Sequence, residues 1–395
     1  MSMQAFRIAR LCSAAQACGV DCLVASSAEN IAYMTGGYTS IGQSVSASTQ
    51  IYAVLSTAKQ SVSYVISVAE VPNILEFAGL SADIYCYGAF HFEFAEGGDA
   101  FVQRAEEVCA KRYATAEEAL AAAVQAAGGS PAFDENHINF QLARQIAKAI
   151  GTETLAPASA IFREARRIKH PEEIRMLRES ARIAEESLLE ALDGAKPGIT
   201  EADLQSRYRL AVTRRGAVPY FFVATAAHRA AYVDAHNTGL KIGRGDMIRF
   251  DFGCIWHGFY SDLARTAVLG EPDEQTQKAY DAVAAGARAQ FDKLRPGVSA
   301  EDMFLAAVEG TRAAGIPTYV RNHCGHGIGL EGYDIPSLAE SFAMTIEKDM
   351  VLCLETPYYC VGWGGVQIEH TVAVTENGFE FLDSGENDLI VVPID

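Results

Sequence analysis

The sequence predicts an α/β fold in two domains, residues 1–157 and 158–395, of which the second is an α+β unit with two similar halves. The chain has 395 residues, more than a single hydrophobic core usually holds. Its first part alternates helix-like and strand-like segments, which is typical of a layered α/β domain. Its second part repeats a turn, a helix and a strand hairpin, which favours an internal duplication.

In the first domain, runs rich in β-branched and aromatic residues predict strands, and amphipathic runs predict helices. The predicted strands are residues 21–26, 50–56, 61–67 and 83–88. The predicted helices are residues 3–17, 99–112, 115–127 and 139–151. The segment "ARRIKHPEEI" then indicates a linker that leads into a long amphipathic helix. Pro171 suits the first position of that helix, and the acids that follow suit its first turn.

The second domain contains a weak internal repeat. The phrase "KPGITEADL" at 196 recurs as "RPGVSAEDM" at 295, and "GDMIRFD" at 245 recurs as "KDMVLCLE" at 348. Both offsets are near 100 residues, so two equivalent hairpins are expected to meet about a pseudo-two-fold axis. The alternative is that such turn-and-helix phrases recur by chance.

Each hairpin carries a pair of acids, Asp251 with Asp262 and Glu355 with Glu369. The midpoint of the first pair falls between Trp256 and His257, near Gly258, and that of the second at Gly362, so the acids of each pair are expected to face each other across strands. Carboxylates about 5 Å apart repel unless a cation lies between them. Acids at a sheet edge that face water are the alternative, which explains one pair better than two.

A histidine, His326, lies between the two acid pairs in the glycine-rich segment "HCGHGIGLEGYDIP". Oxygen ligands with one imidazole suit Mn²⁺, Co²⁺, Fe²⁺ or Zn²⁺. Carboxylates can bridge two such ions, which together activate water for attack on an amide carbonyl. A carboxylate beside that water can carry its proton to the leaving amine. The pattern therefore predicts two divalent ions and hydrolysis without a covalent intermediate.

Composition excludes several function classes. A formal charge of −18 argues against a nucleic-acid groove or an anionic membrane surface, and no apolar run approaches the roughly 18 residues of a spanning helix. The N-terminus lacks the features of a signal peptide. Nine cysteines without a CxxC motif indicate reduced thiols in a cytoplasmic protein. A cysteine nucleophile, Cys324 or Cys353, remains an alternative because both lie near the acids in sequence.

At this point the sequence resembles the pita-bread metallopeptidases, which include prolidase and aminopeptidase P, with creatinase as a metal-free relative. The likeness rests on the order of Asp, Asp, "GHGIG", Glu and Glu, and on the first hairpin "GDMIRFDFGCIWHGFYSDLARTAVLG". The phrases "SSAENIAYMTGGY" and "RRIKHPEEI" are similar to the creatinase-type N-terminal domain and its junction. The resemblance implies a creatinase-type domain at 1–157 and a pita-bread catalytic domain at 158–395.

The resemblance also implies roles for particular residues. It implies five metal ligands: Asp251, Asp262, His326, Glu355 and Glu369. Within this set Asp251 would hold one ion, Asp262 and Glu369 would bridge both, and His326 and Glu355 would complete the second. Glu355 would also be the general base and acid. His236, in "DAHNTG", would contact substrate, and Thr266 would hydrogen-bond a ligand carboxylate.

Three departures from the family pattern bear on the substrate. Tyr333 and Asp334 stand where a His-Glu pair is usual, Gln367 replaces an arginine, and "ETP" replaces "EPG". Tyr333 is expected to bind substrate and steady the developing oxyanion in place of the histidine. Gln367 is expected to lie beside the substrate, where it lacks the charge that suits a substrate carboxylate. A neutral amide or an unusual dipeptide therefore becomes an alternative substrate.

The resemblance predicts a cytoplasmic, homodimeric metallopeptidase-like hydrolase of the Xaa-Pro dipeptidase or aminopeptidase P type. Its cofactors would be two divalent ions per chain, Mn²⁺ first, with Co²⁺, Zn²⁺ or Fe²⁺ as alternatives. Its partner would be a small peptide or amide substrate, with no nucleic acid and no membrane. One rival is a creatinase-like small-molecule C–N hydrolase, or a lyase, on the same scaffold. A second rival is a non-catalytic binding protein, against which the intact ligand set speaks.

Overall fold

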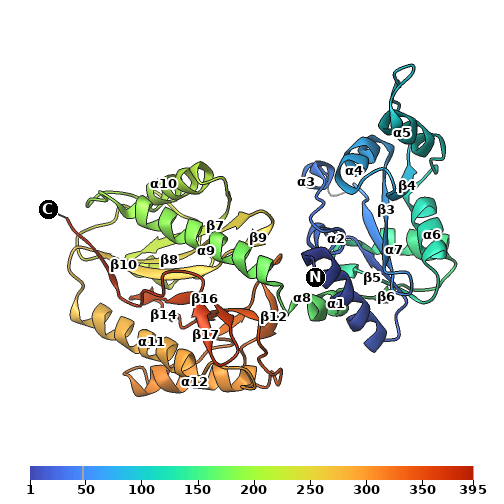
Figure 1. Ribbon diagram of the computed structural model, residues 1–395. Helices are drawn as coiled ribbons and strands as arrows, with labels where there is room; N and C mark the ends of the chain where they lie inside the picture. Colours follow the sequence, from blue (N-terminus) through green and yellow to red (C-terminus); the bar gives the residue numbers. More distant parts are fainter. Residues whose placement is uncertain (47–48, 395) are drawn as a thin grey trace. The chain divides into compact units, whose positions relative to one another are not determined.

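The protein divides into two compact units, Met1–Arg166 and Arg167–Asp395, which Figure 1 shows in a computed structural model that describes residues 1–46 and 49–394. The sequence analysis predicted the division between residues 157 and 158. In the structure, α8 (Ser159–Arg166) belongs to the first unit. The reason is packing. Helix α8 lies against α1 (Met3–Ala17), where Arg10 Nε donates to the carbonyl of Ala165 at 3.2 Å.

The first unit is a six-stranded mixed sheet with helices packed around it (Figure 1), in the strand order β4-β3-β2-β1-β5-β6. Its strands are β1 Cys22–Ala25, β2 Tyr52–Ser56, β3 Ser61–Ser67, β4 Asp83–Tyr87, β5 Pro131–Phe133 and β6 Ala156–Pro157. Its other helices are α2 Ala28–Thr35, α3 Ile41–Val45, α4 Val71–Ala78, α5 Ala100–Ala110, α6 Ala116–Ala127 and α7 Phe140–Ile150, with short 3₁₀ turns at Val68–Glu70 and Glu135–His137.

The four strands and four helices predicted for this unit are confirmed. Strand β1 is buried along its whole length because it pairs on both sides, antiparallel with β2 and parallel with β5. Apolar residues without alternation therefore mark it in the sequence. Helices α2, α3, α4 and α8 and the short strands β5 and β6 were not predicted, since runs of two to eight residues carry little periodicity.

The second unit has a ten-stranded sheet whose main path runs β12-β11-β13-β16-β10-β8-β7. Its helices are α9 Pro171–Leu192, α10 Glu201–Arg214, α11 Glu274–Lys293 and α12 Ala300–Ala313, with a 3₁₀ turn at Ala227–Ala231. Its strands are β7 Val218–Ala226, β8 Met247–Trp256, β9 Phe259–Tyr260, β10 Leu263–Leu269, β11 Gly325–Gly327, β12 Asp334–Ser337, β13 Val351–Glu355, β14 Tyr358–Cys360, β15 Gly364–Val366, β16 Glu369–Val374, β17 Phe379–Phe381 and β18 Ile390–Val392. Helix α9 begins at Pro171 as predicted.

The internal repeat is confirmed by the order of the elements. The first half runs α9, α10, β7, β8, β10, and the second runs α11, α12, β11, β13, β16. In the sheet the two halves meet at the β10–β16 pair, where Ala264 is opposite Glu369. The strand order outward from that pair is equivalent on both sides, so the axis of the pseudo-two-fold passes between β10 and β16. Figure 1 shows a helix pair attached to each half.

Strand alternation separates the core from the acids. Phe252, on β8, packs edge-on against Tyr208 of α10, with ring centroids 5.8 Å apart. Leu352 and Leu354, on β13, belong to a buried apolar cluster with Met303 of α12. Because neighbouring residues of a strand point to opposite faces, Asp251 and Glu355 point away from these helices. The sheet therefore offers one face to the core and the other to the acids.

The register confirms one acid pair as directly opposite and corrects the other. Glu355 is paired with Glu369 across β13 and β16. Asp251, in contrast, is opposite Ala264, because the turn of the first hairpin is centred on His257 and Gly258, both with positive φ. Asp262 is therefore a diagonal neighbour of Asp251 on the same face, not its direct partner.

The glycines around His326 let three strands approach closely. Strand β11 lies between β12 and β13, and His326 is paired with Cys353 on one side and Ser337 on the other. A Cβ atom at Gly327 would lie 2.3 Å from the carbonyl oxygen of Ile335, so any side chain there would push β12 away. Among the described residues, no helix combines the length and apolar character that a membrane crossing requires.

Candidate metal centre

The structure brings the five residues of the predicted ligand set to one region of the sheet. Ligand atoms of Asp251, Asp262 and Glu369 lie within 4.8 Å of one another. His326 Nε2 lies 3.6 Å from Asp262 Oδ2 and 3.9 Å from Glu369 Oε1, and Glu355 faces Glu369 across the strand pair. Four carboxylates and one imidazole thus converge from both halves of the repeat.

The imidazole of His326 is oriented to offer its Nε2 lone pair. Its Nδ1 lies 2.9 Å from the carbonyl oxygen of Gly327. Because a carbonyl oxygen only accepts hydrogen bonds, Nδ1 carries the proton in this contact. The Nε2 atom then faces the carboxylates as an acceptor and has no hydrogen-bond partner among the described residues. Metal-ligating histidines are commonly held in this way.

The burial of the acids fits a cation site. Asp262, Glu355 and Glu369 are at most 6% exposed, and Glu369 Oε1 has no hydrogen-bond partner among the described residues. Burial, reinforced by the neighbouring carboxylates, raises the pKa of Asp262 and Glu369 well above the usual range. Burial also raises the pKa of Asp251 to about 6, against the opposing charge of Arg249. Divalent cations would let these acids ionise together.

Glu355 differs from the other three acids because of His323. The Nε2 atom of His323 lies 2.8 Å from Glu355 Oε1. Burial by itself would raise the pKa of Glu355, but contact with His323, aided by His326 and Arg321, lowers it overall. Sequence reasoning did not select His323, although a second histidine three residues before His326 was a usable signal.

Gln367 lies behind Asp251, where it joins several polar groups. Its Nε2 donates to Asp251 Oδ2 at 3.2 Å, and its Oε1 accepts from Arg249 Nη1 at 2.9 Å and from the Tyr359 hydroxyl at 3.2 Å. The residue is only 1% exposed. The structure therefore directs this amide toward a candidate ligand, whereas the sequence had suggested that it faces substrate.

Arg249 supplies a guanidinium next to Gln367, the position at which the family pattern has an arginine. Its side chain is fully buried, it lies 3.6 Å from Asp251 Oδ2, and it donates to the carbonyls of Ala230, Tyr232 and Val233. These partners together fix the guanidinium of Arg249 beside Asp251. The sequence signal was a charged residue inside the apolar run "MIRFDFG", which was not interpreted.

Exchanging the side chains of Arg249 and Gln367 should show that their contributions to the unfolding free energy are coupled. Arg249→Gln leaves several buried carbonyls without a donor, and Gln367→Arg crowds two buried guanidinium groups, so each single change should cost on the order of 3 kcal/mol of unfolding free energy. The double variant moves the guanidinium to the neighbouring strand and should recover at least half of the summed loss. Denaturant unfolding of the metal-free protein measures this cycle. Additive losses in the double variant would contradict it, and Arg288→Gln, at an exposed position of α11, is the control.

A second buried network holds the backbone of Glu369 in place. Arg265 Nη1 donates to the Glu369 carbonyl at 2.6 Å, and its Nη2 donates to Glu185 Oε1 at 2.5 Å. Asp383 accepts from the backbone N–H of Thr371 at 2.8 Å, two residues after Glu369. These contacts tie β16 to β10 and α9, so the two halves of the cluster keep a fixed separation.

Tyr333 and His236 occupy different positions relative to the cluster. The ring of Tyr333 stacks on His326 with centroids 3.7 Å apart and an interplanar angle of 21°, yet the residue is 60% exposed. It therefore lies between the cluster and solvent. His236 lies in an exposed segment whose carbonyl accepts from Arg229 Nη2 at 2.8 Å. No hydrogen bond or ion pair within the described residues joins its imidazole to the cluster.

Thr266 and the cysteines depart from their suggested roles. Thr266 Oγ1 bonds to the backbone carbonyl and N–H of Gln367, each at 2.9 Å, and so fixes that strand instead of a ligand carboxylate. Cys324 and Cys353 are fully buried, and burial raises the pKa of both thiols, that of Cys324 to about 12. A thiolate nucleophile at either position is therefore disfavoured.

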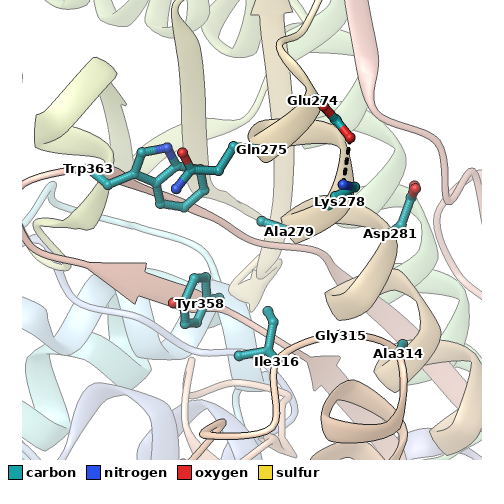
Figure 2. A pocket seen from close by; sticks show the side chains of 10 residues that line it. All are labelled: Glu274, Gln275, Lys278, Ala279, Asp281, Ala314, Gly315, Ile316, Tyr358 and Trp363. Carbon is teal, nitrogen blue, oxygen red and sulfur yellow. Dashed lines mark hydrogen bonds and ion pairs between the residues drawn. The ribbon is translucent and has the colours of Figure 1, made fainter.

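A cavity of about 640 Å³ lies apart from the cluster, between α11, the end of α12 and the β14–β15 hairpin (Figure 2). Its aromatic lining comes from Tyr358 and Trp363, and Figure 2 shows the ion pair of Glu274 with Lys278, at 2.6 Å. None of its lining residues belongs to the five-residue set. The candidate metal centre is therefore a different site.

A duplicated sheet that gathers four carboxylates and a histidine on one face defines a metal-dependent peptidase of the pita-bread fold. The chain belongs to metallopeptidase family M24, whose sequence profile matches residues 175–376. The profile of the creatinase/prolidase N-terminal domain matches residues 7–168. The protein is thus a metallopeptidase-like hydrolase of amide or peptide bonds, and its family implies divalent metal ions.

Relatives match most of the chain. An uncharacterized peptidase, YqhT, of Bacillus subtilis is 25% identical over 95% of this chain and 96% of its own length. A Xaa-Pro dipeptidase of Pyrococcus furiosus is 26% identical over 65% of this chain and 74% of its own. The solved structure of a Xaa-Pro dipeptidase from Bacillus anthracis has a TM-score of 0.82 at 22% identity and covers 98% of this chain and 99% of its own, a likeness in fold.

Proposed function

We propose that the protein is a Xaa-Pro dipeptidase or aminopeptidase-P-like enzyme that works with two divalent ions per chain, Mn²⁺ first. The observation that carries the proposal is the convergence of four carboxylates, three of them buried, and His326 Nε2 from both halves of the fold. The ligands would be Asp251, Asp262, His326, Glu355 and Glu369. A relative named Xaa-Pro dipeptidase supports the substrate class.

The protein's own residues would handle the proton. Bound divalent ions supply Lewis acidity, which activates water and polarises the scissile carbonyl. Glu355 would accept the proton of the attacking water and deliver it to the leaving amine. The contact with His323 and the lowered pKa suit this role, because the general base must be ionised before it can act. His236 and Tyr333 would contact substrate.

A panel of substrates tests the function. The protein, loaded with Mn²⁺, should cleave Xaa-Pro bonds, faster in dipeptides if it is a Xaa-Pro dipeptidase and faster in longer peptides if it is aminopeptidase-P-like. Turnover of guanidino or acylamino compounds without cleavage of any peptide would favour the creatinase-like C–N hydrolase or a lyase. Tight metal binding without turnover of any compound would favour the binding protein.

Tyr333→Phe should lower kcat by about 10²-fold, the scale of one lost oxyanion donor, with KM changed less. The reason is that a donor to the oxyanion acts on charge that develops in the transition state. The stacking on His326 remains in the variant, because phenylalanine keeps the ring. Steady-state kinetics on the best dipeptide measures the effect. An unchanged kcat would show that Tyr333 only packs against His326.

We also place the enzyme in the cytoplasm as a homodimer. All nine cysteines are free, which fits a reducing compartment. In the related fold the creatinase-type domain of one subunit helps to close the site of another, which favours a dimer. Light scattering across a dilution series tests this. A monomer that keeps full activity at every concentration would contradict it.

A further inference from the structure

The cavity of about 640 Å³ between α11, the end of α12 and the β14–β15 hairpin lies outside the site of the proposed peptidase reaction. Its volume falls within the range of about 300–1,000 Å³ that is common for small-molecule sites. All of its lining residues belong to the second unit, and all differ from the candidate metal ligands. The chemical character of this lining therefore decides which ligand the cavity suits.

Two aromatic rings form the hairpin side of the cavity. Tyr358 lies on β14 and Trp363 in the turn that follows it, and their ring centroids are 6.2 Å apart with an interplanar angle of 45°. Both side chains are only partly buried, although they pack against the apolar cluster that contains Ile316. Partly exposed tyrosine and tryptophan rings attract cations and flat apolar groups.

Helix α11 forms the charged side of the cavity. Glu274, Lys278 and Asp281 follow one another at intervals of four and three residues, so they lie on one face of the helix. Lys278 Nζ lies 2.6 Å from Glu274 Oε1, and this ion pair, drawn in Figure 2, neutralises both charges. Asp281 accepts a hydrogen bond from Gln277 Nε2 at 2.8 Å, but no cation among the described residues lies within ion-pair distance of it. The lining therefore has one carboxylate in excess, that of Asp281.

We propose that this cavity binds a small organic cation, in which an ammonium group is joined to a flat apolar group. The two aromatic rings and the free carboxylate of Asp281 would attract the ammonium group. Ala279 and Ile316, which also line the cavity, would contact the flat group. Anions are disfavoured, because the ammonium of the lining is already paired with a carboxylate and the excess charge is negative. The proposal goes beyond the peptidase function and does not depend on it.

The first test compares three aromatic probes that differ in charge: benzyltrimethylammonium, benzyl alcohol and phenylacetate. Calorimetry is done on the Mn²⁺-loaded protein, because bound metal would neutralise the acids of the candidate centre and a quaternary ammonium cannot coordinate a metal. The cation should bind about tenfold more tightly than the alcohol, the combined scale of two cation–π contacts and one exposed carboxylate. The anion should bind most weakly. Added salt should reduce the preference for the cation, because it screens the carboxylate.

Two variants and one control then locate the bound cation. Trp363→Leu keeps an apolar side chain but removes a ring, and Asp281→Asn removes the excess charge. Each should weaken binding of the cation about two- to fivefold and should change binding of the alcohol less. Asp292→Asn, at an exposed position of α11 outside the lining, removes the same charge and should leave both affinities unchanged.

Fluorescence gives a second readout of the same site. The chain has two tryptophans, Trp256 and Trp363, so Trp256→Phe leaves Trp363 as the sole reporter. In this variant the cation should change the emission of Trp363 over the concentration range in which calorimetry shows binding. Equal affinities of cation and alcohol, an unchanged emission of Trp363, or an affinity that Trp363→Leu and Asp281→Asn leave intact would each overturn the proposal. So would binding of the cation to the metal-free protein alone, because it would then lie among the acids of the candidate centre.

Discussion

Glu355→Gln should lower kcat by about 10²- to 10⁴-fold, the contribution of a positioned general base and acid. Glutamine has nearly the same shape and keeps one oxygen for a metal, but it cannot accept and return a proton. KM for the dipeptide should therefore change much less than kcat. Stopped-assay kinetics at saturating Mn²⁺ measures both, and elemental analysis reports the metal content of the same sample.

The matched control for this variant is Glu376→Gln, a surface acid that pairs with Lys348 at 2.7 Å. It should behave as the wild type does. If Glu355→Gln retains a kcat near that of the wild type with full metal content, Glu355 is only a ligand. If metal content falls in parallel with kcat, the loss is one of binding, and the general-base role has no support from this experiment.

Loading with Mn²⁺ should bind two ions per chain and raise the unfolding free energy by about 3–4 kcal/mol per ion when the metal is 100- to 1,000-fold above its Kd. The physical reason is the relief of repulsion among carboxylates that the fold holds together. Elemental analysis after dialysis gives the stoichiometry, and thermal unfolding gives the shift. Fewer than one ion per chain, with no thermal shift, would contradict a metal centre.

Glu369→Gln makes this prediction more specific. The side chain of Glu369 is buried with an unpartnered oxygen, so replacing it by a neutral amide should make the metal-free protein at least as stable as the wild type. The same variant should gain little from Mn²⁺, because a bridging ligand is gone. A variant that is less stable without metal and still gains the full shift would show that Glu369 is a packing residue and not a ligand.

The candidate ligands could be found from sequence because their signals are local. Asp251 and Glu355 interrupt apolar strand runs, and each is followed by a turn and a second acid at hairpin spacing. The glycines beside His326 mark a place where backbones approach closely. These patterns can be recognised without knowledge of the whole fold, since alternation along a strand already decides which residues share a face.

The surroundings of those residues needed the tertiary structure. The contact of Arg249 with Gln367 joins positions 118 residues apart, and it exists only because β8 and the approach to β16 meet near the β10–β16 pair. The contact of His323 with Glu355 depends on how β11 lies against β13. No local sequence pattern predicts such pairs, because strand order and rotamer choice decide which side chains far apart in sequence come into contact.

The sequence by itself determined the two-domain α/β plan, the duplicated hairpins and the candidate set of metal ligands. Local alternation, turn chemistry and motif spacing are enough for these. The tertiary structure decided that α8 joins the first unit, that Asp262 is diagonal to Asp251, and that Gln367 supports Asp251. Packing, register and burial act between distant segments, so only the folded chain defines them.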